Sequence, residues 1–414
     1  MLEHFFAGAP TLARLRTGLT GPFGDGFADV LGNAGYARGT ARGYLRAAAH
    51  LGMWMQGEGL GIGALDERGL AGFAQHLRHC ACLRRNRGRY ADAIAGARHF
   101  LAHVRARGLV TVPQVSAGRA LPGVLEHFEE WMRCHRGIAE RTLQGYRPIL
   151  LDLLRRVGDP QRFAAGPLRQ FVLDRAAPRG RSYAKTITKA VRMFLRYAAS
   201  HGLAEARLID AIPTIAHWRL ASLPVYLPAA DVERLVHAPE PSTPVGLRDR
   251  AMLLLLARLG LRAGDLIALH LHDIDWQAGT LIVTGKGRRA ARLPLPQDAG
   301  DALLAYLTTG RPVSGDDHVF LRLHAPVRGL RHQVTVAEAV HRAAERAGVR
   351  LPRGGGHVLR HSLATALVRG GVPLAAIGML LRHRSAETTA YYAKVDVPLL
   401  RTVARCWPLE VPPC

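Results

Sequence analysis

The chain has 414 residues, and 56 lysines and arginines against 32 aspartates and glutamates give it a formal net charge of +24. A soluble protein this basic is expected to have a polyanionic partner, so the composition favours nucleic-acid binding. Arginine dominates the basic residues, which suits bidentate phosphate contacts, although a GC-rich genome would also favour arginine without any functional cause.

The length predicts about two to three domains, and a hydrophobic content of 48% supports a globular chain. The five cysteines are odd in number and form no CxxC pair, so neither a disulfide framework nor a thiolate zinc site is indicated. We therefore expect a reducing cytoplasm. The longest apolar run, 251–257, is far too short to cross a bilayer, and no basic stretch leads into a long apolar segment near residue 1, so no membrane or export role is expected.

An internal repeat organises the first half of the chain. The segment 35–44 recurs 102 residues further on, at 137–146. Each copy leads into a helical apolar pattern, then a basic stretch, then an amphipathic helix expected at 91–106 and at 186–201. The repeat predicts two related helical modules, of which one or both contact DNA. The basic candidates of the second module are Arg179, Arg181, Lys185 and Lys189.

The stretch 212–228 contains three prolines and is predicted to be an interdomain linker. Beyond it we expect a helix beginning near residue 231 and an apolar helix over 247–259, with Gly260 as its C-cap. Alternating residues at 280–284 and 288–295 predict a β-hairpin with Lys286 at its tip. From residue 334 onward the chain is predicted to be mostly helical, with breaks at 370–371 and 382–385.

The last third of the chain holds an ordered set of side chains that together can bind a phosphodiester and attack it. A phosphodiester under attack concentrates negative charge on its non-bridging oxygens, and two guanidinium groups can stabilise that charge. Either arginine alone would be interpreted as an ordinary surface charge. The functional interpretation therefore depends on the order of the whole set and on the local sequence around each member. The set is Arg262, Lys286, His357, Arg360, His383 and Tyr392.

A tyrosine hydroxyl has an ordinary pKa of about 10, so it needs a base or a cationic environment to attack phosphorus. His357 and His383 can each serve as the base or donate a hydrogen bond to the phosphate. Lys286 can protonate the leaving 5′-oxygen, and Arg288 and Arg289 are adjacent rivals that can also bind DNA.

Asp265 is expected either to orient Arg262 or a neighbouring histidine, or to cap a helix. Tyr391 and Tyr392 are neighbours on a predicted helix that Ser385 caps. A helix turns by about 100° per residue, so the two side chains cannot both face one site. The nine-residue step from His383 favours Tyr392, which leaves Tyr391 as the expected core residue.

Three alternative sites are rejected on spacing. His357 and His361 stand four residues apart as in a zinc-protease helix, but Val358 occupies the position of the catalytic glutamate. The segment 279–287 is one residue too long for a phosphate-binding loop, and a glycine follows its lysine. No paired carboxylates indicate a two-metal nuclease. We therefore expect no metal and no cofactor.

The local sequences around these residues resemble those of the tyrosine recombinases of the phage integrase family, near lambda integrase and the Xer recombinases and of the kind borne by mobile elements. The first arginine box matches 259–266, and the hairpin lysine matches 284–287. The box with the histidine and second arginine matches 357–365, and the final box matches 381–385 and 388–395. The resemblance covers about residues 225–400. A glycine commonly precedes the last histidine in the family, whereas Arg382 stands there here, and we expect activity to tolerate it.

The resemblance implies a mainly α fold with a small β-sheet or hairpin: one or more helical core-binding domains and a mixed α+β catalytic domain. The expected domains are an N-terminal helical module (1–112), a core-binding domain (113–218) and a catalytic domain with a C-terminal tail (219–414). It also implies attack by Tyr392 to give a 3′-phosphotyrosine, without ATP or metal. The implied partners are double-stranded DNA with specific recombination sites and a homotetramer, or an assembly with related recombinases.

Two other classes remain open. A type IB topoisomerase would use the same catalytic residues to relax supercoils, but the resemblance outside those residues favours integrases. A non-catalytic or partner-dependent accessory protein would need the charge and the helices without the full set of active-site residues, and the intact set argues against it.

Overall fold

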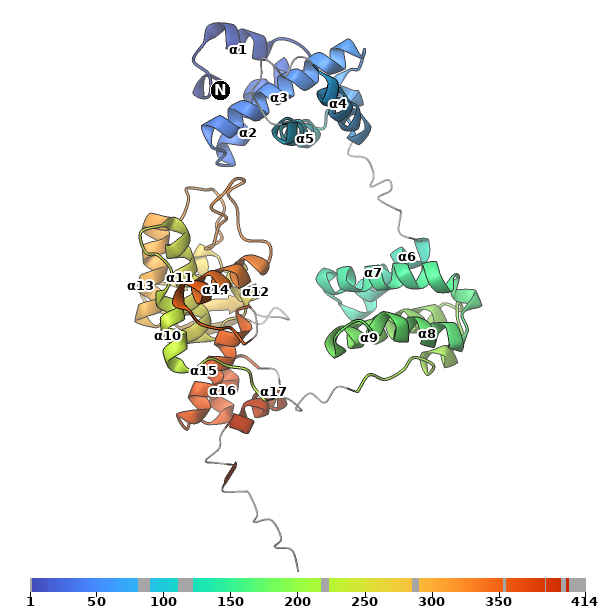
Figure 1. The fold of residues 1–414 in the computed structure, drawn as a ribbon, viewed down its shortest axis with the longest axis vertical. Helices are drawn as coiled ribbons and strands as arrows, with labels where there is room; N and C mark the ends of the chain where they lie inside the picture. The colour runs from blue at the N-terminus through green and yellow to red at the C-terminus, as the bar shows by residue number, and fades with distance from the viewer. Residues whose placement is uncertain are drawn as a thin grey trace, which may run out of the picture. The chain divides into compact units, whose positions relative to one another are not determined.

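The computed structural model describes residues 2–80, 90–110, 122–216, 223–284, 290–352, 355–383, 385–395 and 400–401 (Figure 1). Contacts group the chain into two compact units, Met1–Thr111 with Leu223–Cys414 and Val112–Ser222. The domain boundaries predicted after residues 112 and 218 fall outside the described residues. Within the described part, no helix is long and apolar enough to cross a membrane.

The first 110 residues form a helical module with its own hydrophobic core, in which Phe27, Phe73 and Phe100 are fully buried. The amphipathic helix predicted at 91–106 is confirmed, and it begins one residue earlier. The helices are α1 (Ala9–Arg16), α2 (Gly24–Asn33), α3 (Arg38–Gly57), α4 (Glu67–His79) and α5 (Tyr90–Ala106).

Residues 122–212 form a second helical core around Phe128 and Phe194, which pack edge to face with ring centroids 5.5 Å apart. The closing helix begins at Arg181, five residues before the predicted start, because the apolar face already includes buried Ala184. The helices are α6 (Gly123–Arg136), α7 (Glu140–Val157), α8 (Ala165–Ala176) and α9 (Arg181–Ser200).

The two copies of the repeat adopt the same local structure. Gly35 and Gly137 both have positive φ angles, +74° and +55°, a conformation that glycine adopts without steric cost. Two residues later, Ala37 and Ala139 are the N-caps of the long helices α3 and α7. The repeat therefore marks equivalent helix starts, as the sequence predicted.

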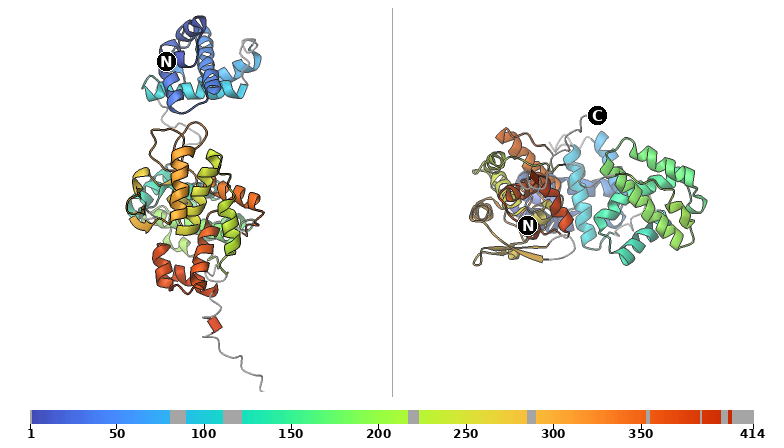
Figure 2. Two further views of the ribbon diagram at one scale, coloured as in Figure 1. Left: turned by 90° about the vertical axis from the view of Figure 1, so that its left-hand side faces the viewer. Right: turned by 90° about the horizontal axis from the view of Figure 1, so that it is seen from below.

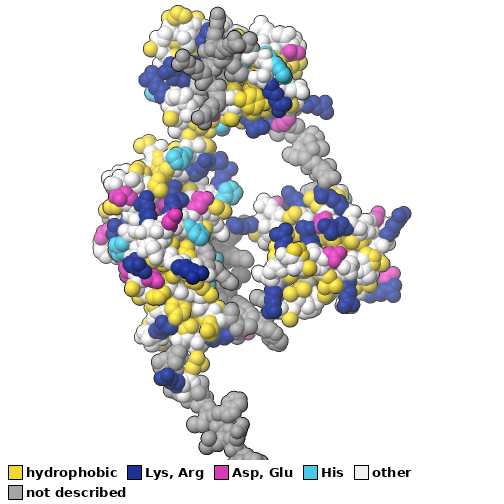
Figure 3. All heavy atoms as spheres, in the orientation of Figure 1, with side chains coloured by type: hydrophobic (Ala, Val, Ile, Leu, Met, Phe, Trp, Pro, Cys, Tyr) yellow, Lys and Arg dark blue, Asp and Glu magenta, His cyan; other side chains and the backbone are white. Residues whose placement is uncertain are grey.

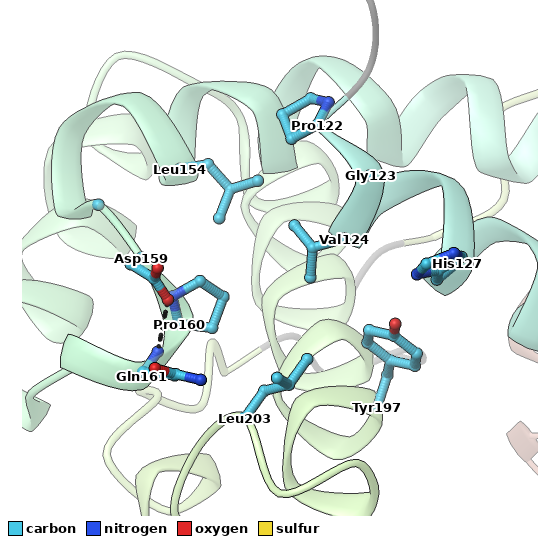
Figure 4. A pocket seen from close by; sticks show the side chains of 11 residues that line it. Pro122, Gly123, Val124, His127, Leu154, Asp159, Pro160, Gln161, Tyr197 and Leu203 are labelled. Carbon is cyan, nitrogen blue, oxygen red and sulfur yellow. Dashed lines mark hydrogen bonds between the residues drawn. The ribbon is translucent and has the colours of Figure 1, made fainter.

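A pocket of about 680 Å³ opens beside α6 in the second unit. Its lining is largely apolar, with Val124, Leu154 and Leu203 around it, and Asp159 accepts a hydrogen bond from the backbone of Gln161 at its rim (Figure 4). None of the predicted site residues lines this pocket, so it has no part in the chemistry argued below.

The last part of the chain is built around a buried helix, α11 (Pro244–Leu259). It ends before the C-cap Gly260 as predicted, but it begins three residues before the predicted start, after the N-cap Thr243. Most of the other helices in this part contact it, and Figure 2 shows the chain from two further directions. They are α10 (Ala229–His237), α12 (Ala263–Ile267), α13 (Gln297–Ala305), α14 (Val334–Ala347), α15 (His357–Arg369), α16 (Leu374–Leu380) and α17 (Ala386–Ala390).

The predicted hairpin is confirmed by β2 (Thr280–Thr284) and β3 (Ala290–Pro294), which pair antiparallel, with β1 (Ile274–Asp275) on the other edge of β2. Leu281 lies opposite Leu293, and both are buried, so the alternating pattern packs one face on the core. The predicted breaks are also present, since α15 ends at Arg369 and α16 ends at Leu380.

Gly260 ends α11 in the left-handed conformation with φ of +58°. A Cβ atom there would lie 2.6 Å from Leu381 Cδ2 and 3.1 Å from Leu363 Cδ2. We expect Gly260→Ala to lower the free energy of unfolding by about 1–2 kcal/mol from the backbone alone, and by more if those leucines cannot shift. Denaturant unfolding checks this, with Gly279→Ala as the control: Gly279 also has a positive φ, +59°, but open space around it. Equal losses in both variants would show that crowding at Gly260 contributes nothing.

Candidate active site

Four segments bring together the predicted chemical residues that the structure describes. Arg262 is the N-cap of α12, directly after the end of α11. His357 and Arg360 lie in the first turn of α15. His383 follows the end of α16, and Tyr392 is the second residue of a 3-10 helix over Tyr391–Val395. Most of these residues therefore lie at or near the ends of helices.

Arg360 is the most deeply buried of the predicted arginines that the structure describes, with 4% of its surface exposed. Its two terminal nitrogens donate hydrogen bonds to the carbonyl oxygens of Gly260 and Leu381. Burial, followed by the positive charge of Arg262, lowers the pKa of Arg360 to about 10. The group is therefore still charged at neutral pH, and it ties the end of α11 to the end of α16.

Tyr392 is also buried, with 2% of its surface exposed. Burial raises the pKa of its hydroxyl to about 12, and the nearby charges of Arg360 and Arg262 act in the opposite direction. The hydroxyl is thus protonated at neutral pH in this form of the protein. An attack by its oxygen needs both a base and a change that exposes it to a phosphate.

The hydroxyl of Tyr392 forms a 2.8 Å hydrogen bond with Nδ1 of His361. In the sequence, His361 stands out only as half of a zinc motif, and His357 and His383 are the predicted bases. The helical period could have indicated His361, because residues four positions apart, such as 357 and 361, lie on the same face of α15. His361 is therefore a candidate base that the sequence reasoning missed.

The two predicted histidines, His357 and His383, have different surroundings from His361. Burial, with the charges of Arg360 and Arg262, lowers the pKa of His357, so its ring is neutral at neutral pH. Nδ1 of His383 forms a 2.8 Å hydrogen bond with the hydroxyl of Thr389. The His383 ring lies parallel to the Tyr392 ring, with an interplanar angle of 1° and centroids 6.2 Å apart.

The two neighbouring tyrosines face different ways, as predicted, but their burial is the reverse of the expectation. Tyr391, expected in the core, is partly exposed, and its hydroxyl donates a 2.7 Å hydrogen bond to the carbonyl of Leu223. Tyr392 is the buried one. The expectation is wrong because α17 ends at Ala390 and the tighter 3-10 turn that follows directs Tyr392 inward, toward His361.

Asp265 has a capping role and an ionic role at once. Its carboxylate accepts a 2.9 Å hydrogen bond from the backbone N–H of Arg262, and it forms a 2.6 Å ion pair with Arg382. Both side chains of the pair are largely buried, Arg382 with 12% and Asp265 with 6% exposed. Of the alternatives left open by the sequence, helix capping is confirmed, and the guanidinium that Asp265 holds is that of Arg382.

Arg382 adopts a left-handed backbone conformation with φ of +54°, the one such residue other than glycine in the part of the chain that the structure describes. A glycine would fit this conformation without strain, which gives a physical reason for the glycine common at this position in the family. Here the position is taken by an arginine whose side chain forms the buried ion pair with Asp265.

Replacing Arg382 with glycine tests which effect is larger. The change relieves a backbone cost of about 1–2 kcal/mol, but it leaves a buried carboxylate without its cation, which costs about 3–5 kcal/mol. We therefore expect Arg382→Gly to be less stable than the wild type in urea unfolding. Arg382→Gly combined with Asp265→Asn should recover part of the loss. Greater stability of the single variant would contradict this account of the pair.

The other predicted site residues fall into two groups. Lys286, Arg288 and Arg289 lie outside the described residues. Arg181, Lys185 and Lys189 are exposed at intervals of four residues along α9, so they form one stripe, with Arg179 exposed just before the helix. The guanidinium of Arg179 lies 5.3 Å from the centre of the Tyr183 ring. Lysine and arginine side chains are prominent on the visible face of this unit (Figure 3).

The protein is strongly basic and mainly helical, with a small β-hairpin sheet. In its last part, two arginines and a group of histidines lie around a tyrosine hydroxyl. These are the features of a tyrosine recombinase. Comparisons with known proteins agree with this class. The family model of the phage integrase family matches residues 226–397.

The y4rA protein of Sinorhizobium fredii strain NGR234, which carries an integrase/recombinase name, is 36% identical over 392 residues, 93% of this chain and 93% of that protein. The tyrosine recombinase XerD of Xanthomonas campestris pv. campestris is 33% identical over 296 residues, 67% of this chain and 90% of XerD. The chain therefore belongs to the phage integrase family of tyrosine recombinases, whose activity is site-specific DNA recombination.

Solved structures show the same fold at lower identity. XerH recombinase in a post-cleavage complex with a palindromic difH substrate is 19% identical with a TM-score of 0.54, covering 67% of this chain and 83% of that one. Lambda integrase in a tetramer bound to a Holliday junction is 20% identical with a TM-score of 0.52, covering 70% of this chain and 79% of that one. The predicted fold class is confirmed.

Proposed function

We propose that this recombinase cleaves and rejoins DNA at specific sites through a 3′-phosphotyrosine formed by Tyr392, for integration, excision or transposition of a mobile element. The observation that carries the proposal is the position of the Tyr392 hydroxyl, 2.8 Å from Nδ1 of His361 and within the electrostatic influence of Arg360 and Arg262. A phenol needs both a proton acceptor and positive charge to attack a phosphodiester.

The proposed step balances as a single displacement. The Tyr392 oxygen forms a bond to phosphorus, its proton passes to a histidine, and the bond from phosphorus to the 5′-oxygen breaks. The resemblance assigns the protonation of that leaving oxygen to Lys286, with Arg262 and Arg360 stabilising the non-bridging oxygens. His357 is held neutral by burial and can donate a hydrogen bond to the same phosphate.

Neither ATP nor a metal ion is required for this chemistry. The phosphodiester energy is conserved in the protein–DNA bond, and a 5′-hydroxyl from a partner duplex reverses the step. Strand exchange between two duplexes requires four active protomers, so we propose a tetramer of this chain, or of this chain with related recombinases, acting on DNA in the cytoplasm. The tetramer of lambda integrase on a Holliday junction supports this arrangement by analogy.

The helical parts provide DNA contacts in this proposal. We assign residues 113–218 to a core-binding domain and residues 219–414 to the catalytic domain. The repeat, with its equivalent helix starts at Ala37 and Ala139, supports a related role for the module of residues 1–112.

The exposed stripe on α9 gives a quantitative prediction. If Lys185 and Lys189 each neutralise one phosphate, the double alanine variant should bind duplex DNA more weakly, and the slope of log K against log salt should fall by about 0.9 per lost contact. Fluorescence anisotropy over a range of salt concentrations measures both quantities. Arg155→Ala, an exposed basic change on α7, is the control. An unchanged slope in the double variant would remove α9 from the interface.

A recombination assay tests the proposed function. Two plasmids carrying the ends of the chain's own genetic element, incubated with the protein without ATP or metal, should yield joined products dependent on those ends. Relaxation of any supercoiled plasmid without joined products would indicate a type IB topoisomerase. Tight binding to the ends with neither reaction would indicate an accessory protein that needs a partner recombinase.

A further inference from the structure

Three metal-ligating side chains converge in the N-terminal module, far in sequence from the predicted active site. Nε2 of His50, on α3, lies 3.2 Å from Nε2 of His76, on α4, and 3.5 Å from Sγ of Cys80, which follows α4. All three ligand atoms lie within 4.8 Å of one another. His76 lies in the last turn of α4, and Cys80 is the extended residue directly after that helix.

Hydrogen bonding alone accounts poorly for this arrangement. Nε2 of a neutral imidazole carries either one N–H or one lone pair, directed in the plane of the ring. That single position on His50 has two partners, His76 and Cys80, at hydrogen-bonding distance. An ion at the centre of the three atoms would instead take one lone pair from each ligand.

The separations match those of ligands on one zinc ion. Zinc binds histidine nitrogen at about 2.0–2.1 Å and thiolate sulfur at about 2.3 Å, usually in a tetrahedron. Two nitrogens on such an ion are then about 3.3 Å apart, and a nitrogen and a sulfur are about 3.6 Å apart. The His50–His76 and His50–Cys80 separations, 3.2 and 3.5 Å, agree with both values.

The surroundings also suit a bound ion. His50 is 6% exposed, and the fully buried Phe73 packs edge to face against its ring at 5.3 Å. Trp54 lies beside His76, with ring centroids 6.2 Å apart. This apolar surround holds the imidazoles in place and limits competition from water, while His76 and Cys80 stay partly exposed and give an ion a path of entry.

We propose that His50, His76 and Cys80 bind one zinc ion, which ties the middle of α3 to the end of α4 and stabilises the N-terminal module. Two imidazoles and a thiolate favour zinc over magnesium or calcium, which prefer oxygen ligands. The three residues leave one coordination position for water or another ligand. The sequence predicted no thiolate zinc site because it has no CxxC pair. Ligands that come from separate segments of the chain form no such motif, so the prediction could not detect them.

Metal analysis of the untagged full-length protein tests the proposal. After incubation with zinc and dialysis, plasma mass spectrometry should find about one zinc ion per chain. His76→Gln and Cys80→Ser should hold less than about a fifth of that amount. The matched controls are His79→Gln, an exposed histidine on the same helix, and Cys134→Ser, an exposed thiol in the other unit. Both controls should keep the wild-type zinc content.

Two further measurements separate a site from a folding defect. Cobalt should give a thiolate charge-transfer band in the wild type that Cys80→Ser lacks, and circular dichroism should show the helical content of both variants unchanged. A chelator should lower the thermal midpoint of the wild type but leave that of His76→Gln unchanged. Zinc-free wild-type protein after the same incubation, or equal zinc in the wild type and both ligand variants, would overturn the proposal. None of these readouts depends on recombination.

Discussion

Tyr392→Phe is expected to eliminate the covalent protein–DNA adduct, with a loss of at least about 10³-fold, because the variant lacks the attacking oxygen. Folding should survive, since the change removes only one hydrogen bond, to His361, worth about 1 kcal/mol. Incubation with nicked duplexes followed by denaturing electrophoresis measures the adduct.

Tyr391→Phe is the matched control for this experiment. It removes a neighbouring hydroxyl that donates to the carbonyl of Leu223 rather than to a histidine. We expect the adduct to form within a few-fold of the wild-type rate. The assignment of Tyr392 as nucleophile fails if Tyr392→Phe still forms the adduct, or if Tyr391→Phe alone abolishes it.

The second large effect is expected at Arg360, where charge and architecture coincide. Arg360→Lys keeps a positive charge, but one ammonium group cannot reproduce the two bonds to Gly260 and Leu381 or the planar fork needed by a phosphate. We expect cleavage to slow by about 10²–10³-fold. A buried carbonyl without a partner should also lower the free energy of unfolding by about 1–3 kcal/mol.

Single-turnover cleavage and denaturant unfolding separate the two losses at Arg360. Arg258→Lys is the control, because Arg258 lies on α11 but forms ion pairs with Glu233 and Asp298 at the surface. That variant should cleave at the wild-type rate. Wild-type cleavage by Arg360→Lys would remove Arg360 from the proposed chemistry, whatever its effect on stability.

Local signals predicted much of the fold. Gly260 marked the end of α11 because a helix commonly ends at a residue in the left-handed conformation. Alternating residues marked β2 and β3 because their side chains point to opposite faces. In each case the residues that determine the structure are close together in sequence, so the sequence pattern alone was enough to predict the element.

The details of the candidate site depended on contacts between distant segments. The hydrogen bond between Tyr392 and His361 joins residues 31 positions apart, and the ion pair between Arg382 and Asp265 joins residues 117 positions apart. The motifs indicated which segments form the site, but they did not indicate which residues of one segment contact which residues of another. The candidate base and the role of Asp265 therefore became visible only in the structure.

The proposed function depends above all on the covalent attachment of Tyr392 to DNA. The most direct test traps the protein on a suicide duplex, digests the complex with protease and nuclease, and identifies the modified peptide by mass spectrometry. Our account predicts a 3′-nucleotide phosphate on Tyr392 and an unmodified Tyr391 in that peptide. A phosphodiester link on any other residue would contradict it.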